Sequence, residues 1–243
     1  MPTPGEVLAA MLRSDATRPR LTFYDDAEGP TRGERIELSA KVIGNWVNKA
    51  GNALQDELGA GSGAVVVIAM PVHWRSVYWA LAAWSVGATV VLAQHGAGGG
   101  ATAVRRADVL VTDDPDLART ASGRAVLVSL PMLARAHPEA AEGVFDEARE
   151  LAGFGDVLDV WDPPDPAAPA FAGPHGEPTA YGELVPVRDW GAGPRVHLRG
   201  PLDRVLRDAL AAWALDGSVV MVRDPHGDQT DRLTSEAVTV DVS

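Results

Sequence analysis

From residue 65 onward, short apolar segments alternate with amphipathic ones, and this alternation constrains the fold more than any other feature of the chain. Val65–Met70 is apolar throughout, as is typical of strands buried on both faces of a sheet. Trp74–Val86 has helical spacing, and Thr89–Ala93 and Asp108–Thr112 are two further strand candidates. Alternating strands and helices predict parallel strands joined by right-handed crossovers. We therefore predict an α/β fold: a doubly wound, mostly parallel sheet with helices on both faces.

The flanking segments extend this pattern in both directions. Met1–Arg13 is expected to form a helix, and Leu21–Asp25 and Arg35–Leu38 a pair of strands. Ser39 is a suitable N-cap for the long helix that follows, and Gly59 ends that helix. Later strands are expected at Ala125–Leu130, Arg195–Leu198 and Ser218–Arg223, with an edge strand at Val238–Val242. Helices are expected at Val144–Gly153 and Pro201–Leu215.

Composition narrows the functional classes. The 33 acidic and 21 basic residues give a net charge of −12, which repels a phosphate backbone and excludes nucleic acid as a partner. The absence of cysteine excludes disulfides, thiolate metal sites and thiol nucleophiles. The longest apolar run, Ala64–Val72, is far too short to span a membrane. We therefore expect a soluble, cytoplasmic protein that does not bind membranes.

Motifs of several enzyme classes are missing. Residues 96–100 are rich in glycine, but Thr102 stands where a dinucleotide-binding fingerprint requires glycine, so we expect a flexible loop. No two of the six histidines have metal-binding i, i+4 spacing, which favours surface or capping roles and predicts no metal site. No serine is framed as G-x-S-x-G. Since Lys41 and Lys49 are the only lysines, a G-x-x-x-x-G-K-[ST] phosphate loop is impossible.

One long stretch resembles a known family. The residues that carry the resemblance are Ile36–Ser39, Asn45–Leu54, Leu58–Gly59, Val65–Val67 and Ala80–Ala88. In this order they are similar to the opening of the adenylate-forming enzymes, the AMP-dependent acyl-CoA synthetases and ligases. The resemblance implies a strand pair, a first long helix and the first βαβ unit of that family's N-terminal domain.

A second segment resembles the family's phosphate loop. Ala170–Ala180 reads A-F-A-G-P-H-G-E-P-T-A, against a family pattern of [YF]-T-S-G-T-T-G-x-P-K-G. In the family this loop wraps the phosphates of ATP with backbone N–H groups and hydroxyls. Gly173, Gly176 and Pro178 match the pattern, and Thr179 occupies the position of the family's lysine. These four residues are our candidate cofactor-binding residues, in a degenerate and non-functional loop.

The other departures from the pattern weaken phosphate binding further. Ala172, Pro174 and His175 replace a serine and two threonines, and Ala180 replaces the last glycine. Proline has no N–H to donate, and Glu177 adds a negative charge. Each charge-assisted hydrogen bond contributes about 1.5–3 kcal/mol, so losing several predicts a loss of ATP binding by orders of magnitude. The alternative is a proline-rich turn that resembles the loop by chance.

The resemblance also sets expectations for domain organisation. Asp162–Pro174 is rich in proline and fits neither a helix nor a central strand. We expect residues 1–162 to form an N-terminal α/β subdomain, and residues 163–243 to hold the degenerate loop and the start of a second α/β subdomain. The family's adenine-binding and ribose-binding segments, its hinge, and its C-terminal lid with the catalytic lysine are expected to be missing.

Three functional hypotheses remain open. The first is a non-catalytic binding or interaction module, with no cofactor and no catalytic residue. The second is an ATP-dependent, AMP-forming acid–thiol ligase for fatty or aryl acids, which uses ATP and Mg²⁺ and is completed by a second polypeptide. The third is a pocket that binds acyl groups or a nucleotide without turnover.

The C-terminal segment predicts self-association. Apolar residues recur at helical spacing from Leu202 to Trp213, and Val219–Val222 is apolar at every position, which implies cover on both faces. We expect a homodimer, or a protein partner that supplies the missing half, to cover this surface. The alternative is that Thr234–Ser243 and the proline-rich segment fold back as the cover.

Overall fold

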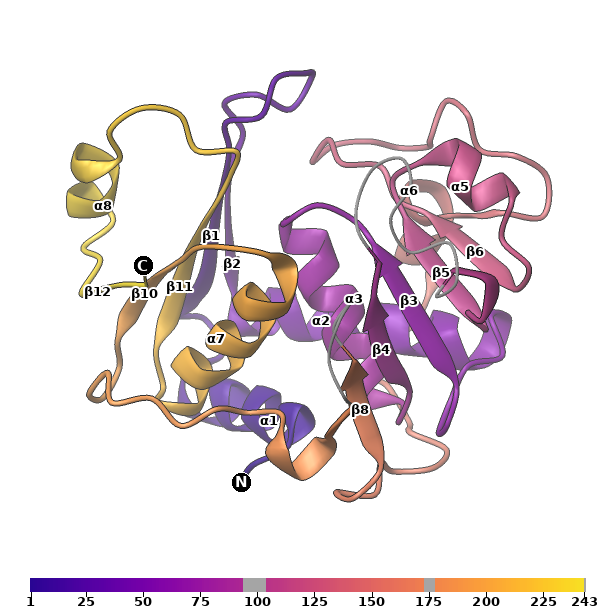
Figure 1. Cartoon of the computed structure of the whole chain (residues 1–243), viewed down its shortest axis with the longest axis horizontal. Helices are drawn as coiled ribbons and strands as arrows, with labels where there is room; N and C mark the ends of the chain where they lie inside the picture. The colour runs from indigo at the N-terminus through magenta and orange to yellow at the C-terminus, as the bar shows by residue number, and fades with distance from the viewer. Residues whose placement is uncertain (94–103, 173–177, 243) are drawn as a thin grey trace.

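The computed structural model describes residues 1–93, 104–172 and 178–242, which form two sheets with helices between and around them. Figure 1 shows the sheets side by side, with α1 (Pro4–Asp15), α3 (Trp74–Ser85) and α7 (Leu202–Ala214) in the space between them. One continuous apolar cluster joins both sheets through these helices. The two sheets are therefore parts of a single packed body.

The larger sheet contains the strands on which the fold prediction rests. Its order is β7-β6-β5-β3-β4-β8-β9, and every neighbouring pair is parallel except β8 and β9. The three predicted core strands lie side by side in it as β5, β3 and β4, which confirms the predicted α/β class. The bounds are β3 (Val65–Ala69), β4 (Thr89–Leu92), β5 (Val109–Thr112), β6 (Arg124–Leu127), β7 (Phe145–Asp146), β8 (Pro169–Ala172) and β9 (Thr179–Ala180).

The smaller sheet combines the two ends of the chain. Its order is β12-β10-β11-β1-β2, and all neighbours are parallel except β1 and β2. The predicted N-terminal strand pair therefore belongs with the C-terminal strands. The expected division of the chain at residues 162 and 163 stays a prediction. The bounds are β1 (Pro19–Asp25), β2 (Arg35–Ser39), β10 (Arg195–Leu198), β11 (Ser218–Arg223) and β12 (Val240–Asp241).

Several helices begin after residues whose side chains cap them. Ser39 accepts a hydrogen bond from the amide of Val42 and opens α2, as predicted. His73 opens α3 in the same way, so one of the expected capping histidines is confirmed. The expected helix at 144–153 is helical only from Glu147, as α6 and a 3-10 turn, and the short strand β7 precedes it. The remaining helices are α2 (Ala40–Asn52, continued by a π-helix at Ala53–Glu57), α5 (Pro115–Arg119), α6 (Glu147–Glu150) and α8 (Thr230–Ser235), with 3-10 turns at Leu151–Gly153 and Tyr181–Glu183.

The two ends of the chain are joined by the parallel ladder between β1 and β11. Leu21 pairs with Val219, and the register continues to Asp25 and Arg223. The indole of Trp213 donates to the carbonyl of Arg20 over 2.9 Å. The fully buried guanidinium of Arg20 donates in turn to the carbonyls of residues 216 and 217, at 2.7 and 2.9 Å. These bonds fix the turn before β11 against the start of β1.

The surface expected to promote self-association is covered within the chain. Trp213 is 2% exposed, and residues 219–221 are fully buried. Glu236 accepts hydrogen bonds from Tyr24, Arg35 and Arg195 on the side of the sheet away from α7. The expectation of an uncovered apolar surface was therefore wrong, and residues 234–242 fold back onto the sheet. Association with a second chain stays a prediction.

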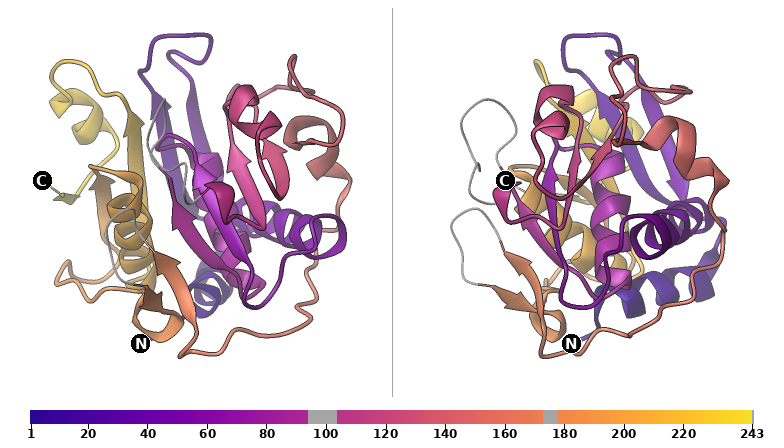
Figure 2. Two further views of the ribbon diagram at one scale, coloured as in Figure 1. Left: turned by 45° about the vertical axis from the view of Figure 1, so that its right-hand side comes forward. Right: turned by 90° about the vertical axis from the view of Figure 1, so that its right-hand side faces the viewer.

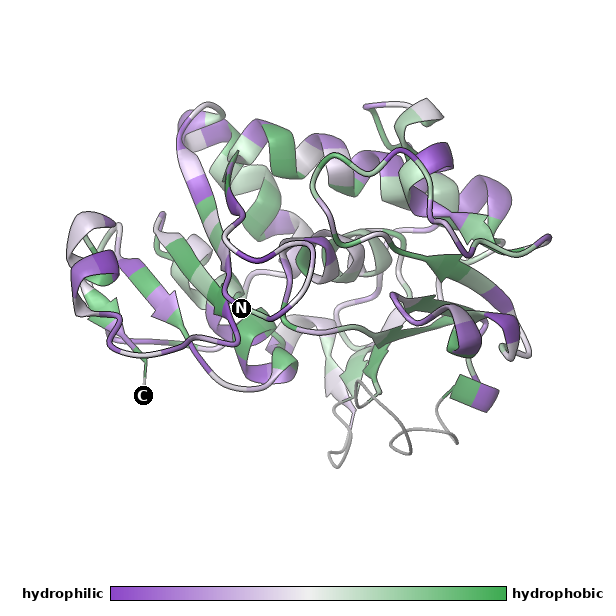
Figure 3. Ribbon diagram, turned by 90° about the horizontal axis from the view of Figure 1, so that it is seen from above, coloured by the Kyte–Doolittle hydropathy of each residue, from purple (hydrophilic) through white to green (hydrophobic). Residues whose placement is uncertain are grey.

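Figure 3 colours the chain by hydropathy: the strands of the larger sheet are mostly apolar, and the helices carry both apolar and polar residues. Within the described residues, every helix is too short or too polar to cross a membrane.

A buried ion pair joins α3 to the segment that begins α6. Nη1 of Arg75 lies 2.7 Å from Oε1 of Glu147, and the two side chains are 5% and 1% exposed. The hydroxyl of Tyr78 donates to the same carboxylate oxygen. Burial raises the pKa of Glu147, and the neighbouring guanidinium opposes that shift. Arg75 also donates to the carbonyl of Pro131 over 3.2 Å, so this one side chain anchors two segments.

Removing the arginine should destabilise the fold strongly. We expect Arg75→Met to reduce the free energy of unfolding by about 3–5 kcal/mol at neutral pH, because the buried carboxyl of Glu147 loses the guanidinium that compensates its charge. Urea denaturation of the variant and the wild type measures the difference. The double variant Arg75→Met/Glu147→Gln should recover a large part of the loss, since glutamine still accepts from Tyr78. A loss below about 1 kcal/mol in the single variant would contradict this account.

Candidate functional site

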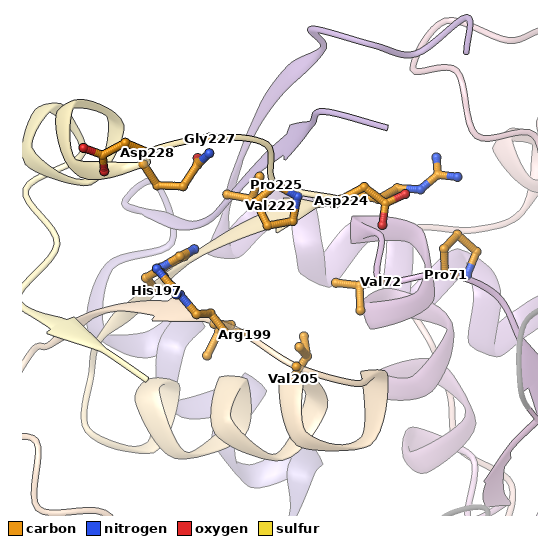
Figure 4. Close-up of a pocket in the computed structure, with 14 residues that line it drawn as sticks. Pro71, Val72, His197, Arg199, Val205, Val222, Asp224, Pro225, Gly227 and Asp228 are labelled. Carbon is orange, nitrogen blue, oxygen red and sulfur yellow. Dashed lines mark hydrogen bonds between the residues drawn. The ribbon is translucent and has the colours of Figure 1, made fainter. Parts of the chain in front are cut away.

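A cleft of about 620 Å³ opens at the carboxyl ends of β10 and β11, against the residues that follow β3. Figure 4 shows its lining residues, which come from β10 and β11 with the segments that follow them, from the segment after β3, and from the first turn of α7. In open α/β folds, ligands bind beyond the carboxyl ends of the strands, where loops can offer side chains without disturbing the ladder. This position makes the cleft the first candidate for a functional site.

The cleft has an apolar side and a polar side. Val72, Val205 and Val222 contribute aliphatic surface from three separate elements. Polar groups come from the end of β10 and from the turn after β11, among them Arg199, Asp224 and Asp228. A hydrophobic wall with a few polar groups is typical of sites for small organic molecules.

His197 is the most buried polar residue of the cleft. Its side chain is 2% exposed, and Nδ1 lies 2.9 Å from Oδ1 of Asp241 on the edge strand β12. Nε of Arg199 lies 3.1 Å from the same carboxylate oxygen. Burial lowers the pKa of His197, whereas the hydrogen bond and charge of Asp241 act to raise it. The imidazole is therefore mainly neutral at pH 7, held by an aspartate that an arginine also contacts.

Arg223 lies where this cleft meets a second one. It ends β11, and its Nη1 donates over 3.1 Å to Oδ2 of Asp25, the fully buried last residue of β1. The other oxygen of that carboxylate accepts from the amide of Ala27 over 3.1 Å. Arg223 also lines a cleft of about 340 Å³ on the other side, between the β1–β2 turn and the ends of β5 and β6. One guanidinium is therefore shared by two neighbouring clefts.

No family model matches the chain. A curated protein of Mycobacterium tuberculosis, described as a TIGR03089 family protein, is 32% identical over 249 residues, which cover 97% of this chain and 96% of that protein. The chain belongs to the TIGR03089 family. Its relative has a similar length, and its printed name states no activity.

Solved structures place this TIGR03089 family member in a known fold. It matches the acyl-CoA synthetase of Brucella canis with a TM-score of 0.71 and 15% identity, over 98% of this chain and 47% of that one. An artificially fused adenylation–PCP di-domain, NpsA-ThdA from Klebsiella oxytoca, matches with a TM-score of 0.70 and 12% identity, over 97% and 42%. The N-terminal subdomain of Klebsiella oxytoca NpsA, in complex with 3-hydroxybenzoyl-AMSN, matches with a TM-score of 0.66 and 13% identity, over 98% and 59%.

These likenesses concern the fold. They show that the TIGR03089 chain has the fold of the N-terminal part of adenylate-forming enzymes, which confirms the fold that the resemblance implied. The chain spans about half the length of the solved proteins that it matches. At 12–15% identity, they carry no statement about activity.

Two of the predicted phosphate-loop residues, Pro178 and Thr179, lie at one edge of the larger sheet. Thr179 begins β9, which pairs antiparallel with β8, and Pro178 precedes it. Gly173 and Gly176 lie outside the described residues. Neither Pro178 nor Thr179 lines either of the two clefts described above. The role of these four residues stays a prediction.

Neither lysine is placed to contact a ligand in these clefts. Nζ of Lys49 bonds the carbonyls of Ala152 and Phe154 and lies 2.9 Å from Oδ1 of Asp156, so it holds the segment after α6 against α2. Lys41 lies in the first turn of α2 and is exposed. Within residues 1–93, 104–172 and 178–242, no group of three or more histidines and carboxylates could hold a metal ion.

Sequence reasoning missed the two most informative residues of the clefts. His197 was expected on the surface or at a cap, but it is buried beneath Asp241 because β12 returns alongside β10. Arg223 ends an apolar strand, and an arginine in that position usually points to solvent. A charged residue directly after four apolar ones, at the carboxyl end of a strand, was the signal available in the sequence.

The histidine offers a direct test of this geometry. We expect His197 to titrate with a midpoint below 6.5, and Asp241→Asn to move that midpoint further down, because the asparagine removes the charge that raises the pKa. NMR of the imidazole resonances across pH 4–8 measures both midpoints, with His197→Gln to assign the signal. An unchanged or higher midpoint in Asp241→Asn would rule out the contact.

Proposed function

We propose that this member of the TIGR03089 family is a binding module that keeps the N-terminal fold of the adenylate-forming enzymes and does not form acyl-adenylates. One observation carries the proposal: Thr179 stands where the adenylate-forming enzymes have the lysine of their phosphate loop. Both lysines of this chain lie on α2. Lysine provides a mobile point charge for phosphates, and a threonine hydroxyl cannot replace it.

The engagement of Lys49 supports the loss of phosphate chemistry. Its ammonium already has two carbonyls and a carboxylate as partners, so moving it to a phosphate would break three contacts. Ala172, at the end of β8, offers no hydroxyl where the adenylate-forming enzymes have a serine. Charge-assisted hydrogen bonds are the main source of affinity for phosphates, and this chain lacks several of them at once.

The inter-sheet cleft supports the binding role. Its volume of about 620 Å³ falls within the range of small-molecule sites. Its apolar wall and polar rim suit a molecule with a hydrophobic body and one polar end. The core beneath it is closely packed, with Val205 and Val222 held by elements of the smaller sheet, so the cleft exists before a ligand arrives.

A thermal-shift screen tests the binding role. A ligand that binds only the folded chain adds about 2.7 kcal/mol of stability at a concentration one hundred times its Kd. We propose a panel of AMP, CoA, fatty acids and aryl acids, each measured on the wild type and on Val72→Arg, which places a charge at a partly exposed position of the apolar wall. A stabilising ligand whose effect is lost in the variant supports the cleft. If no compound stabilises the wild type, the small-molecule form of the proposal is wrong.

A ligase completed by a second polypeptide is the second candidate. It is favoured by the extent of the matches, which leave 41–58% of each of the three solved proteins described above outside the region that this chain covers. That reading requires ATP, AMP and Mg²⁺ to bind at the loop that contains Pro178 and Thr179. An assay for adenylation therefore decides between the two candidates.

We expect the purified chain to catalyse no exchange of radiolabelled pyrophosphate into ATP with any of these acids. Thr179→Lys should not restore exchange, because the lysine returns one cation but neither the serine hydroxyl at Ala172 nor the donor that Pro174 lacks. Thr179→Ser is the matched control, and an active acyl-CoA synthetase verifies the assay. Exchange above the protein-free background by the wild type would overturn the proposal.

A further inference from the structure

The segment between the 3-10 turn at Leu151–Gly153 and β8 crosses the outside of α2 without joining either sheet. Figure 2 shows it running past α2 on its way to β8, and we call its residues 155–162 the strap. None of these residues lines the clefts described above. The strap is therefore a surface separate from the site proposed for small molecules.

Side chains of α2 and of its π-helical continuation hold the strap in place. Asn52 donates to the carbonyl of Val157 over 2.9 Å. Gln55, which is 3% exposed, donates to the carbonyl of Asp159 over 3.0 Å and accepts from the amide of Trp161 over 3.2 Å. Every second residue from 157 to 161 therefore turns backbone polar groups toward α2, which is the spacing of a β-strand.

The residues in between leave the other backbone edge of the strap unpaired. By the same alternation, the amide and carbonyl groups of Leu158 and Val160 face away from α2, and they form no backbone hydrogen bond within the described residues. The side chain of Leu158 packs on α2, so closely that a β-carbon on Gly51 would lie 2.6 Å from it. A row of unpaired backbone groups on a fixed segment is a template for a strand of another protein.

The outward side chains of the strap combine apolar surface with acidic groups. Val157 is 82% exposed and Trp161 is 68% exposed, whereas the other six tryptophans are buried or half-buried. Asp159 lies between these two residues and Asp162 follows them, and both carboxylates are exposed. Tryptophan side chains dominate the binding energy of many protein interfaces once they are covered. An exposed tryptophan on an unpaired edge therefore indicates a docking surface.

The charge of the strap determines which kind of partner it attracts. Asp156 is paired with Lys49 at 2.9 Å, whereas Asp159, Asp162 and the nearby Asp165 form no ion pair within the described residues. The net charge of −12 for the whole chain adds to this local negative charge. An acidic partner, or the strap of a second copy, would be repelled, and a basic segment would be attracted.

We infer that the strap binds a basic segment of a partner protein, which pairs as a strand with its open backbone edge. Apolar side chains of that segment cover Val157 and Trp161. Its lysine or arginine side chains contact Asp159 and Asp162. In such pairing the backbone hydrogen bonds provide affinity, and the alternate side chains provide specificity.

The probe is the peptide Lys-Val-Lys-Lys-Lys-Leu-Lys, labelled for fluorescence anisotropy. As a strand it presents valine, lysine and leucine on one face, at the spacing of Val157, Asp159 and Trp161. We expect saturable binding that weakens as salt is added, and protection of Trp161 from quenching by acrylamide. The same peptide with glutamate in place of lysine should not bind. Absence of saturable binding, or equal binding of the glutamate peptide, would overturn the inference.

Methylated peptides test the backbone pairing. N-methylation of the second and fourth residues blocks one edge of the peptide, and N-methylation of the third and fifth blocks the other. We expect one of these peptides to bind at least about tenfold more weakly than the parent, and the other to keep most of the affinity, because a strand pairs through one edge. Equal affinity of both would contradict the pairing.

Variants assign the binding to the strap. Trp161→Ala should weaken the peptide at least about tenfold, and Asp159→Asn and Val157→Ala severalfold. Val187→Ala is the matched control for Val157→Ala, because Val187 is 76% exposed outside the strap. Glu142→Gln removes one exposed charge elsewhere and is the control for Asp159→Asn. Both controls should leave the affinity unchanged, and every variant should keep the wild-type melting temperature, since all five positions are exposed.

Each outcome with these variants decides the inference. If Trp161→Ala and Asp159→Asn bind the peptide as the wild type does, the peptide binds elsewhere and the inference fails. If Glu142→Gln weakens the peptide as much as Asp159→Asn, the attraction belongs to the acidic surface in general and the inference also fails. Light scattering tests the remaining occupant: a wild-type dimer that Trp161→Ala dissociates would show that a second copy covers the strap.

Discussion

The fold depends on the pairing of β1 with β11. It joins residues near the start of the chain to residues almost two hundred positions later, and it brings the smaller sheet against the larger one through α1, α3 and α7. Without it, the carboxyl ends of β10 and β11 would not face the residues after β3, and neither cleft would form. The indole of Trp213 and the guanidinium of Arg20 secure the pairing at its start, and Arg223 with Asp25 secures it at its end.

Sequence patterns predicted the elements of this fold better than their partners. Residues 65–69 and 219–222 lie in strands because unbroken apolar runs are stable only when both faces are covered, and that property is local. The assignment of β1 and β2 to the C-terminal sheet depends on contacts between distant residues, which no local period encodes. The same holds for residues 234–242, whose return over the sheet follows from the partners of Glu236.

For a candidate site, the sequence alone could offer only the residues of a contiguous motif. Thr179 in place of a lysine can be read directly from the sequence, and it carries the proposal that adenylation is lost. The clefts are assembled from residues on four or more elements, so His197, Ser129 and Arg223 gain their meaning from tertiary contacts. The imidazole of His197 is buried. Within the described part of the chain, the hydroxyl of Ser129 and Nε of Arg223 are buried without a hydrogen-bond partner.

The central claim is that this fold has kept a ligand-binding edge while losing the ability to hold ATP. Calorimetric titration of the purified chain with ATP and Mg²⁺ tests that claim most directly, because it measures binding without requiring turnover or a second polypeptide. The account predicts no saturable heat up to about 1 mM ATP, a limit equivalent to about −4 kcal/mol of binding free energy. Saturable binding with a micromolar Kd, about −8 kcal/mol, would contradict it.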